Sequence, residues 1–455
     1  MLYIDVGLIK KEGDSDLPIE GIIKALLDIL STPAFTIALV ALVGLIALKK
    51  RAHEIFTGFI RTFIALLIVV AGAITIVNAL GPLTSLFVRA FGFTGVYTLE
   101  EVTTASAMAA GLGFEVGAIF GIGFILHLII VRILAPKTPF KHVYLTGHVM
   151  WTMAGAIALV LHNYDIVGPG AAALGALLLA IYLTIAPVMV WPFVRRITDG
   201  QWNIGHTQNF GLMIFGGFIP RAINKITGGK ASKMEAEALK LPEQLAFLKQ
   251  PGIISGLIML IVFLVPTIYL GPAVVEAEFS GGTNYIVWAI VQALLFAAGI
   301  EVLLFGVRTF LGEIIPAFRG ISERVIPGAI PALDVPTVYP FRPMALMLGV
   351  LVHVIIVPFA TILQAILRSP LVILPNAIYM FFVGATTGIL ADKEGGIPGV
   401  VIGSILSAFW YMFLPIWAYP FLGIEKLGLT GLSMSADCGI WAVIYGAILK
   451  VILGK

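Results

Sequence analysis

Residues 63–80 read FIALLIVVAGAITIVNAL, eighteen consecutive positions without a charged side chain. A helix that crosses the apolar core of a bilayer needs about 20 such residues, and it satisfies its own backbone hydrogen bonds. Comparable apolar runs lie at 35–48, 252–270 and 346–363. Transmembrane β-strands would instead alternate apolar and polar residues, a pattern that these runs lack. The predicted fold class is therefore an all-α polytopic membrane protein.

The composition agrees with burial in lipid. Hydrophobic residues make up 59% of the 455 residues and charged residues 12%, and the mean hydropathy is +1.04. Polar side chains are thus too few to cover a soluble globule of this length. The net charge of +3 is small, which argues against a nucleic-acid partner. A single cysteine, Cys438, excludes an internal disulfide and a multi-cysteine metal cluster, and we expect no metal site and no cofactor.

Basic residues recur in clusters between the apolar runs, at 49–51, 132–141, 195–196, 221–249, 308–324 and 450–455. Cytoplasmic loops carry an excess of lysine and arginine. Placing every cluster in the cytoplasm requires an even number of crossings between successive clusters, and the intervening apolar runs allow it. The sequence therefore predicts about eleven spans in the cell membrane, with the N-terminus outside and the C-terminus in the cytoplasm.

The spans are divided by one sizeable polar loop. We expect an N-terminal segment at 1–32, a first transmembrane half at 33–220, a cytoplasmic connector at 221–250 and a second transmembrane half at 251–455. Within the first segment, residues 17–30 have one apolar face and a charged one, which predicts an interfacial amphipathic helix. Both halves contain Arg-Thr-Phe, at 61–63 and 308–310, a short match that favours the paired halves of many transporters.

Three stretches mix apolar residues with polar, glycine or proline interruptions, at 203–218, 326–339 and 374–390. Prolines in particular prevent one straight helix at 326–339. Broken backbone at membrane depth is tolerated only where it lines a cavity or is buried in protein. In transporters with paired halves, such segments mark the binding site.

Ionisable side chains within or beside apolar runs are functional candidates, because a charge in a membrane is costly. They are Glu100, Glu115, His127, His148, His206, Glu301, Glu313, Asp334 and His353. Two of them, His206 and Asp334, lie in broken segments, and His148 follows Thr146-Gly147 at the mouth of a span. These three are expected to face a cavity. Five others also have a structural explanation, as partners of neighbouring helices or of the membrane interface: Glu115, His127, Glu301, Glu313 and His353.

Five longer patterns carry a resemblance to a known family: LTGHVMW at 145–151, RRITDGQWNIGHTQNF at 195–210, ALKLPEQL at 238–245, GVRTFLGEIIPAFRGISERVIPGAIPALDVPTVY at 306–339 and LPNAIYMFFVGATTGILADKEGG at 374–396. Together they resemble the ascorbate-specific membrane component, enzyme IIC, of the bacterial phosphotransferase system. The likeness covers nearly the whole chain. It implies a homodimer in which a scaffold part forms the dimer contact and a core part carries substrate across by an elevator-like movement.

The resemblance also implies a set of binding residues. In that family the substrate is held by the TGH histidine, the IGH histidine and the aspartate of the proline-rich segment, which correspond to His148, His206 and Asp334. A glycine-rich patch of the second span also contributes, and it corresponds to Gly72 and Ala73.

Several binding positions depart from the family. Thr152 and Thr207 stand where ascorbate members carry glutamine, Ala73 replaces a serine, and Glu100 aligns with a small hydroxyl residue. These changes favour a substrate other than ascorbate. The predicted substrate-binding set is Gly72, Ala73, Glu100, His148, Thr152, His206, Thr207 and Asp334.

The implied function is a permease that carries ascorbate or a related small polyhydroxylated compound inward. In coupled members a separate cytoplasmic enzyme IIB, which works with a IIA protein, phosphorylates the substrate from a phosphocysteine. His148 and Asp334 are then the pair expected to accept the proton of the reacting hydroxyl. The protein would be at most the membrane component of that phosphotransferase complex.

Two alternatives remain. The same fold without phosphorylation would be a stand-alone facilitator or a proton-coupled carrier. A receptor or structural membrane protein would not need broken segments with buried ionisable groups.

The predicted topology can be tested at the connector. In a parent carrying Cys438→Ala, a cysteine introduced by Ser232→Cys should resist an impermeant thiol reagent added outside right-side-out cells, because the basic connector is expected in the cytoplasm. It should react once the membrane is opened, while the parent should not react in either case. Ready labelling from outside would overturn this orientation.

Overall fold

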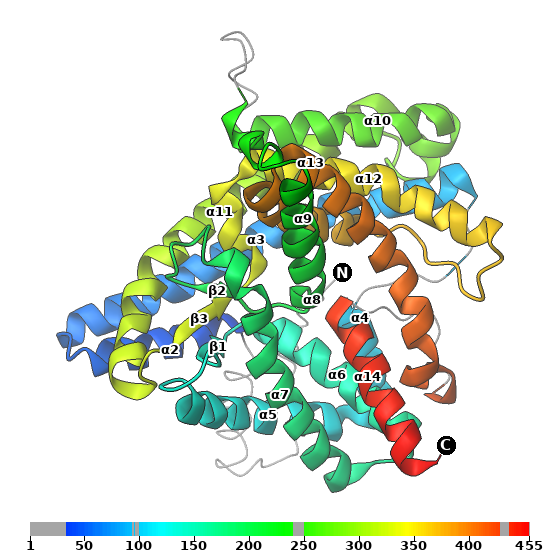
Figure 1. The fold of residues 1–455 in the computed structure, drawn as a ribbon. Helices are drawn as coiled ribbons and strands as arrows, with labels where there is room; N and C mark the ends of the chain where they lie inside the picture. The colour runs from blue at the N-terminus through cyan, green and yellow to red at the C-terminus, as the bar shows by residue number, and fades with distance from the viewer. Residues whose placement is uncertain (1–32, 93–94, 96–99, 240–249, 428–435, 455) are drawn as a thin grey trace, which may run out of the picture.

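The computed structural model describes residues 33–92, 95, 100–239, 250–427 and 436–454. Its longer helices in the first part of the chain are α2 (Pro33–Ala47), α3 (Ala52–Phe91), α4 (Glu100–Ala107), α5 (Gly113–Leu134), α6 (Gly147–Asn163), α7 (Gly168–Val194) and α9 (Ile219–Ile226). The later ones are α10 (Pro251–Glu278), α11 (Tyr285–Gly320), α12 (Pro343–Ile366), α13 (Ala377–Leu422) and α14 (Ala436–Leu453). Figure 1 shows the fold.

Short elements fill the joints between these helices. One of them is the short α-helical segment α8 (Asn209–Gly211). The π-helical segments are η1 (Met108–Leu112), η2 (Leu212–Phe218) and η6 (Ile321–Val325). The 3₁₀ turns are η3 (Ala231–Lys233), η4 (Ala236–Ala238), η7 (Val335–Phe341) and η8 (Ile424–Leu427). The strands are β1 (His142–Tyr144), β2 (Asn203–Ile204) and β3 (Ile330–Leu333).

Seven of the described helices are long and apolar enough to cross a membrane, by length and composition. The four apolar runs at 35–48, 63–80, 252–270 and 346–363 fall in α2, α3, α10 and α12. The backbone of α13 breaks at Gly396, where φ is 57°. The predicted class, an all-α polytopic membrane protein, is confirmed. The number of crossings and the four segment boundaries remain predictions, and the amphipathic segment at 17–30 lies outside the described residues.

The helices form two main apolar cores. Helices α3, α10, α11, α12, much of α13 and the end of α7 share one core, in which Phe296 and Phe381 meet edge to face at 5.2 Å. Helices α5, α6, α7 and α14 share the other with the end of α13. On the outer faces large apolar side chains such as Ile133 and Ile261 are about two-thirds exposed, at 67% and 64%. A surface of this kind is suited to lipid rather than water.

The three strands form one sheet, with strand order β1-β3-β2 and both pairs parallel. Beyond the paired strands, Leu145 N–H donates to Ala332 O and Gly205 N–H donates to Leu333 O, both at 2.9 Å. Successive residues of β3 direct their backbone groups alternately toward β1 and toward β2. The nitrogen of Pro331 therefore faces the β2 side, at a level where β2 has not yet begun. The central strand thus tolerates a proline that lacks a donor.

The prediction of three broken segments is correct for two of them. Residues 203–218 form β2, α8 and η2, and residues 326–339 form β3 and most of η7. The prediction of a broken segment at 374–390 was wrong. From Ala377 it is helical, and the side chain of Asn376 caps it by accepting from the N–H groups of Ile378 and Tyr379.

A charged clamp fastens the connector to α13, near the break at Gly396. The fully buried Asp392 carboxylate pairs with Arg342 and accepts the Ala236 N–H at 2.8 Å. Glu394 receives Arg196 at 2.8 Å and Arg221 at 2.9 Å. Two further bonds complete it: Glu235 pairs with Arg342 at 2.8 Å, and Ile397 N–H donates to Met234 O at 2.8 Å.

Helices α12 and α13 cross closely because small residues face each other. A β-carbon added at Gly349 would overlap the carbonyl oxygen of Gly384, and one added at Gly388 would overlap the carbonyl oxygen of Ala345. Glycine lets two backbones approach in this way, which is a common basis of helix packing in membranes.

Gly349→Ala should therefore destabilise the fold, because the new methyl group meets backbone that cannot move aside. Overpacking of this kind costs about 1 to 3 kcal/mol. We expect a lower melting temperature of the purified protein in detergent. Gly117→Ala on α5 is the matched control, because a β-carbon there meets nothing within 4 Å. Equal melting temperatures of the two variants would contradict this account of the crossing.

Candidate functional site

The carboxyl ends of the three strands meet at one edge of the sheet, because all three strands run parallel. β1 leads through Leu145 and Thr146 into α6, whose first turn carries His148. β2 leads through Gly205 to His206, and β3 leads directly to Asp334. Segments far apart in the sequence thus bring the three candidate side chains together.

Asp334 is fixed by its own backbone. It is the N-cap of η7: its Oδ1 accepts the Val335 N–H at 2.7 Å and its carbonyl accepts the Thr337 N–H at 3.1 Å. One carboxylate oxygen is therefore used as a cap, and the other, Oδ2, remains directed at the site.

The loop that carries His206 is held by a buried carboxylate from α14. Asp437 accepts the Phe210 N–H at 2.9 Å and the Tyr182 hydroxyl at 3.0 Å. Its own N–H donates to Thr207 O at 2.9 Å, and Tyr182 also donates to His206 O at 3.3 Å. Asp437 and Tyr182 therefore position His206. The sequence reasoning missed both, although a lone aspartate at the start of the last apolar block was a signal for Asp437.

The three side chains form a compact polar group. His206 Nε2 lies 3.7 Å from Asp334 Oδ1, and His148 Nε2 lies 3.9 Å from Asp334 Oδ2. The two imidazole rings meet edge to face with centroids 6.1 Å apart. His206 is 7% exposed, whereas His148 and Asp334 are 42% and 35% exposed. Both histidine–carboxylate separations exceed direct hydrogen-bond distance, so a polar atom of a ligand can bridge them.

Burial lowers the pKa of His206 to about 4, against the opposing effect of the Asp334 carboxylate. His206 lies in the loop between α7 and η2, outside the seven spanning helices. At neutral pH its ring is therefore neutral, with one nitrogen that donates and one that accepts.

Several buried polar atoms near the strand ends have no hydrogen-bond partner among the described residues. They include His206 Nδ1, Thr146 Oγ1, Asn203 Oδ1, Gln208 Oε1 and Asn209 Oδ1. Buried polar groups are normally satisfied by protein or by ordered water. The surroundings of the three side chains thus have unused capacity to bind a polar molecule.

The same three residues could also hold a metal ion. Two histidines and one aspartate are a usual ligand set, and their ligand atoms all lie within 4.8 Å of one another. Ligands on one tetrahedral zinc ion at about 2.1 Å sit about 3.4 Å apart, somewhat closer than the 3.7 and 3.9 Å separations found here. The geometry as it stands fits hydroxyl groups better than an ion.

The remaining predicted binding residues lie on other elements. Gly72 and Ala73 are on α3, in its contact with α11, where Gly72 packs on Leu303. Thr152 follows His148 by one turn of α6, is buried, and donates its hydroxyl to Val149 O at 2.9 Å. Thr207 is buried beside His206. Glu100 begins α4, and its side chain lies outside the described part of the chain.

Other ionisable candidates have structural partners. Glu115 accepts the Gly168 N–H at 2.9 Å, Glu301 accepts the Gly252 N–H at 2.8 Å, Glu313 lies 3.7 Å from Arg61, and His353 Nδ1 lies 3.0 Å from Gly349 O. His127 joins α5 to α7 through Thr184 and also accepts the Tyr144 N–H, both at 3.0 Å. His127 thus forms hydrogen bonds to neighbouring elements, as expected for a histidine with a structural role.

Comparison with known proteins places this geometry in a family. Residues 28–437 match the family described as the sugar-specific permease component of the phosphotransferase system, EIIC-GAT. The ascorbate-specific PTS system EIIC component of Mycoplasma pneumoniae is 25% identical over 430 residues, which cover 82% of this chain and 63% of that relative. The chain thus spans less than two-thirds of that relative's length.

The family match covers both halves of the chain and includes His148, His206 and Asp334. Together with the helical membrane fold, it establishes that the chain belongs to the EIIC-GAT family of sugar-specific permease components of the phosphotransferase system.

Proposed function

We propose that this protein carries a small polyhydroxylated compound, ascorbate or a close relative, inward across the cell membrane, and that the compound binds at His148, His206 and Asp334. The observation that carries the proposal is the meeting of these three side chains at the ends of parallel strands, with His206 Nε2 3.7 Å and His148 Nε2 3.9 Å from Asp334. A sugar-like ligand offers several hydroxyl groups, each of which both donates and accepts.

The proposed binding mode uses the gaps in this group. A substrate hydroxyl placed between Asp334 Oδ2 and His148 donates to the carboxylate and accepts from the imidazole. A second substrate hydroxyl can form a hydrogen bond with the neutral imidazole of His206. The remaining buried oxygens near the strand ends would bind further hydroxyls directly or through water.

Phosphorylation, where it is coupled, needs a proton acceptor at the same place. The phosphorus–sulfur bond of a phosphocysteine on a separate IIB protein breaks, and a phosphorus–oxygen bond to the substrate hydroxyl forms. The hydroxyl proton passes to the His148–Asp334 pair, and the cysteine leaves as thiolate. General-base assistance of this kind contributes about a hundredfold to ten-thousandfold.

The proposal includes the assembly and the motion. The protein works as a homodimer with cytoplasmic IIB and IIA partners, its N-terminus outside and its C-terminus in the cytoplasm. The two main apolar cores, which are lined largely by different helices, support a division into a scaffold and a core that move relative to each other as an elevator.

The second candidate is a facilitator or proton-coupled carrier of the same fold. Uptake into proteoliposomes distinguishes it: with IIB, IIA and their phosphate donors inside, the proposal expects accumulated product to be phosphorylated. Uptake of unmodified compound that does not depend on IIB and IIA would favour a facilitator. Dependence on an imposed proton gradient would favour a proton-coupled carrier.

His148→Ala and Asp334→Asn should each lower substrate affinity by about tenfold to a hundredfold, because a hydrogen bond to a charged group contributes about 1.5 to 3 kcal/mol. Ascorbate binding to the purified protein by calorimetry, together with uptake of radiolabelled ascorbate, measures the loss.

Matched controls are available on the surface. His53→Ala removes an exposed histidine of α3. Asp165→Asn replaces an aspartate with positive φ, which asparagine tolerates. Both control variants should bind ascorbate with wild-type affinity. If both site variants kept wild-type affinity while remaining folded, the cavity would lie elsewhere.

The wild-type protein should bind ascorbate weakly, because Thr152 and Thr207 are short and buried. A glutamine amide reaches farther and offers donors and an acceptor, and each unpaired ligand group costs about 1 to 3 kcal/mol. Thr152→Gln combined with Thr207→Gln should therefore tighten ascorbate binding in a titration. Micromolar affinity already in the wild type would show that waters bridge the shorter side chains.

A further inference from the structure

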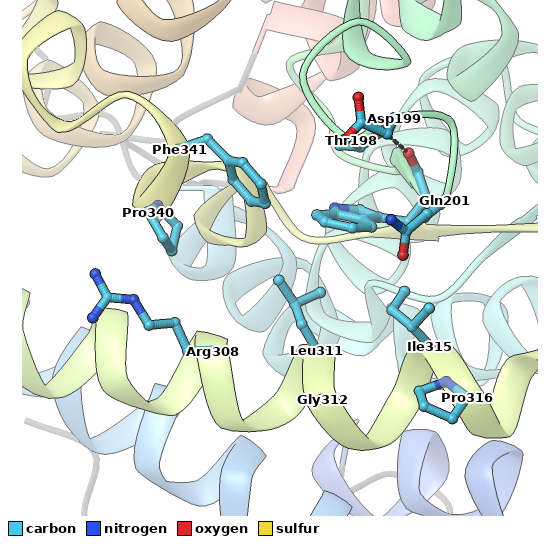
Figure 2. Close-up of a pocket in the computed structure, with 11 residues that line it drawn as sticks. Thr198, Asp199, Gln201, Arg308, Leu311, Gly312, Ile315, Pro316, Pro340 and Phe341 are labelled. Carbon is cyan, nitrogen blue, oxygen red and sulfur yellow. Dashed lines mark hydrogen bonds between the residues drawn. The ribbon is translucent and has the colours of Figure 1, made fainter. Parts of the chain in front are cut away.

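The end of η7 that lies away from Asp334 is only loosely packed. Phe341, its last residue, faces α11 across a hollow of about 440 Å³ (Figure 2). The Phe341 ring is in contact with Trp202, with centroids 5.5 Å apart, and the residue is 43% exposed. Val335 and Val338, nearer Asp334, are fully buried in an apolar core. Core packing therefore holds the first part of η7, and other contacts must hold its end.

Arg342 comes directly after η7 and fastens this end. Its side chain is 10% exposed and pairs with Asp392 and, at 2.8 Å, with Glu235. Asp392 is fully buried in α13, and Glu235 belongs to the connector. A guanidinium presents its N–H groups in a rigid fork, so two carboxylates fix its direction as well as its position. We call these two ion pairs the η7 tie.

The surroundings of the η7 tie are themselves held. Asp392 also accepts the Ala236 N–H at 2.8 Å, which fastens the connector to α13. The next acidic residue of the connector, Glu237, accepts the N–H groups of Met344 at 2.7 Å and Ala345 at 3.0 Å, in the first turn of α12. The joint between η7 and α12 is therefore held from two sides, by α13 and by the connector.

At the other end of η7, the Asp334 carboxylate is fixed to the first turn. Its Oδ1 accepts the Val335 N–H at 2.7 Å, and its carbonyl accepts the Thr337 N–H at 3.1 Å. The segment has only 7 residues, and two of them, Pro336 and Pro340, have a fixed φ. A displacement of the far end of η7 is therefore passed on to the carboxylate.

We infer that Arg342 is a positioning residue for Asp334. Through η7 it holds the carboxylate 3.7 Å from His206 and 3.9 Å from His148. Because Glu235 is one of its two anchors, the connector takes part in supporting the site. Binding groups must stay within about 0.5 Å of their productive positions, so a loosened η7 should weaken binding. The inference rests on the proposed function, in which Asp334 binds the compound.

The test variant removes the η7 tie without leaving a buried charge. Arg342→Met alone would leave the Asp392 carboxylate unpaired, a change that is strongly destabilising. Asp392→Asn combined with Arg342→Met replaces the buried pair by neutral groups, which is often tolerated. Glu235 is 32% exposed and still has Lys393 at 3.9 Å. The melting temperature of this double variant should therefore stay close to that of the wild type.

Hydrogen exchange followed by mass spectrometry measures the η7 tie without any ligand. In the double variant the backbone N–H groups of residues 335–341 should exchange about tenfold faster than in the wild type, because the end of η7 is released. Glu394→Gln is the matched control, since it breaks the pairs with Arg196 and Arg221 in the same charged clamp. It should leave exchange at 335–341 unchanged. Wild-type exchange in the double variant would overturn the inference.

Calorimetric titration of the purified full chain with ascorbate tests the link to the site. The double variant should bind ascorbate about tenfold more weakly than the wild type. In a background carrying Asp334→Asn, the same double substitution should weaken binding less than about twofold further, because the carboxylate that Arg342 positions is no longer present. An equal loss in both backgrounds would show that Arg342 acts on the fold in general, and would overturn the inference.

A third outcome separates the inference from the proposed function. If residues 335–341 exchange faster in the double variant while Asp334→Asn binds ascorbate with wild-type affinity, the support of η7 by Arg342 is upheld. The proposed role of Asp334 in substrate binding is then refuted instead.

Discussion

A backbone N–H or C=O buried away from water must find a partner inside the protein, and this constraint shapes the centre of the molecule. Three short non-helical segments satisfy each other's backbone groups as a parallel sheet. Parallel pairing makes the strands end on one edge. His148, His206 and Asp334 come together there because the backbone of their segments has nowhere else to bond.

The sheet also determines how the chain is divided. β1 and β2 come from the first transmembrane half and β3 from the second, so the candidate site belongs to both halves. The charged clamp joins Arg196 and Arg221 to Glu394 across the same boundary. In the elevator movement proposed above, a moving part would therefore combine segments from before and after the polar connector.

Much of this could be predicted from the sequence, because uninterrupted apolar runs and prolines act locally. The helices and two broken segments follow from such patterns, and the same patterns select the three candidate side chains, whose binding role remains a prediction. Strands of two to four residues have no readable periodicity, so the sheet was not predictable. Asp437 and Tyr182 act through distant partners, 227 and 24 positions along the chain from Phe210 and His206. The segment at 374–390 was misread because Pro375 precedes a helix instead of interrupting one.

The clamp at Gly396 constrains how the sequence can change through evolution. Glu394 is shared by two arginines, and Arg342 by two carboxylates. Removing one partner of a buried pair leaves an uncompensated charge, whereas replacing the whole group by apolar residues can be neutral. Substitutions at these positions are therefore tolerated in sets and not singly. Related chains should show correlated changes here, between a loop that looks free to vary and the middle of a membrane helix.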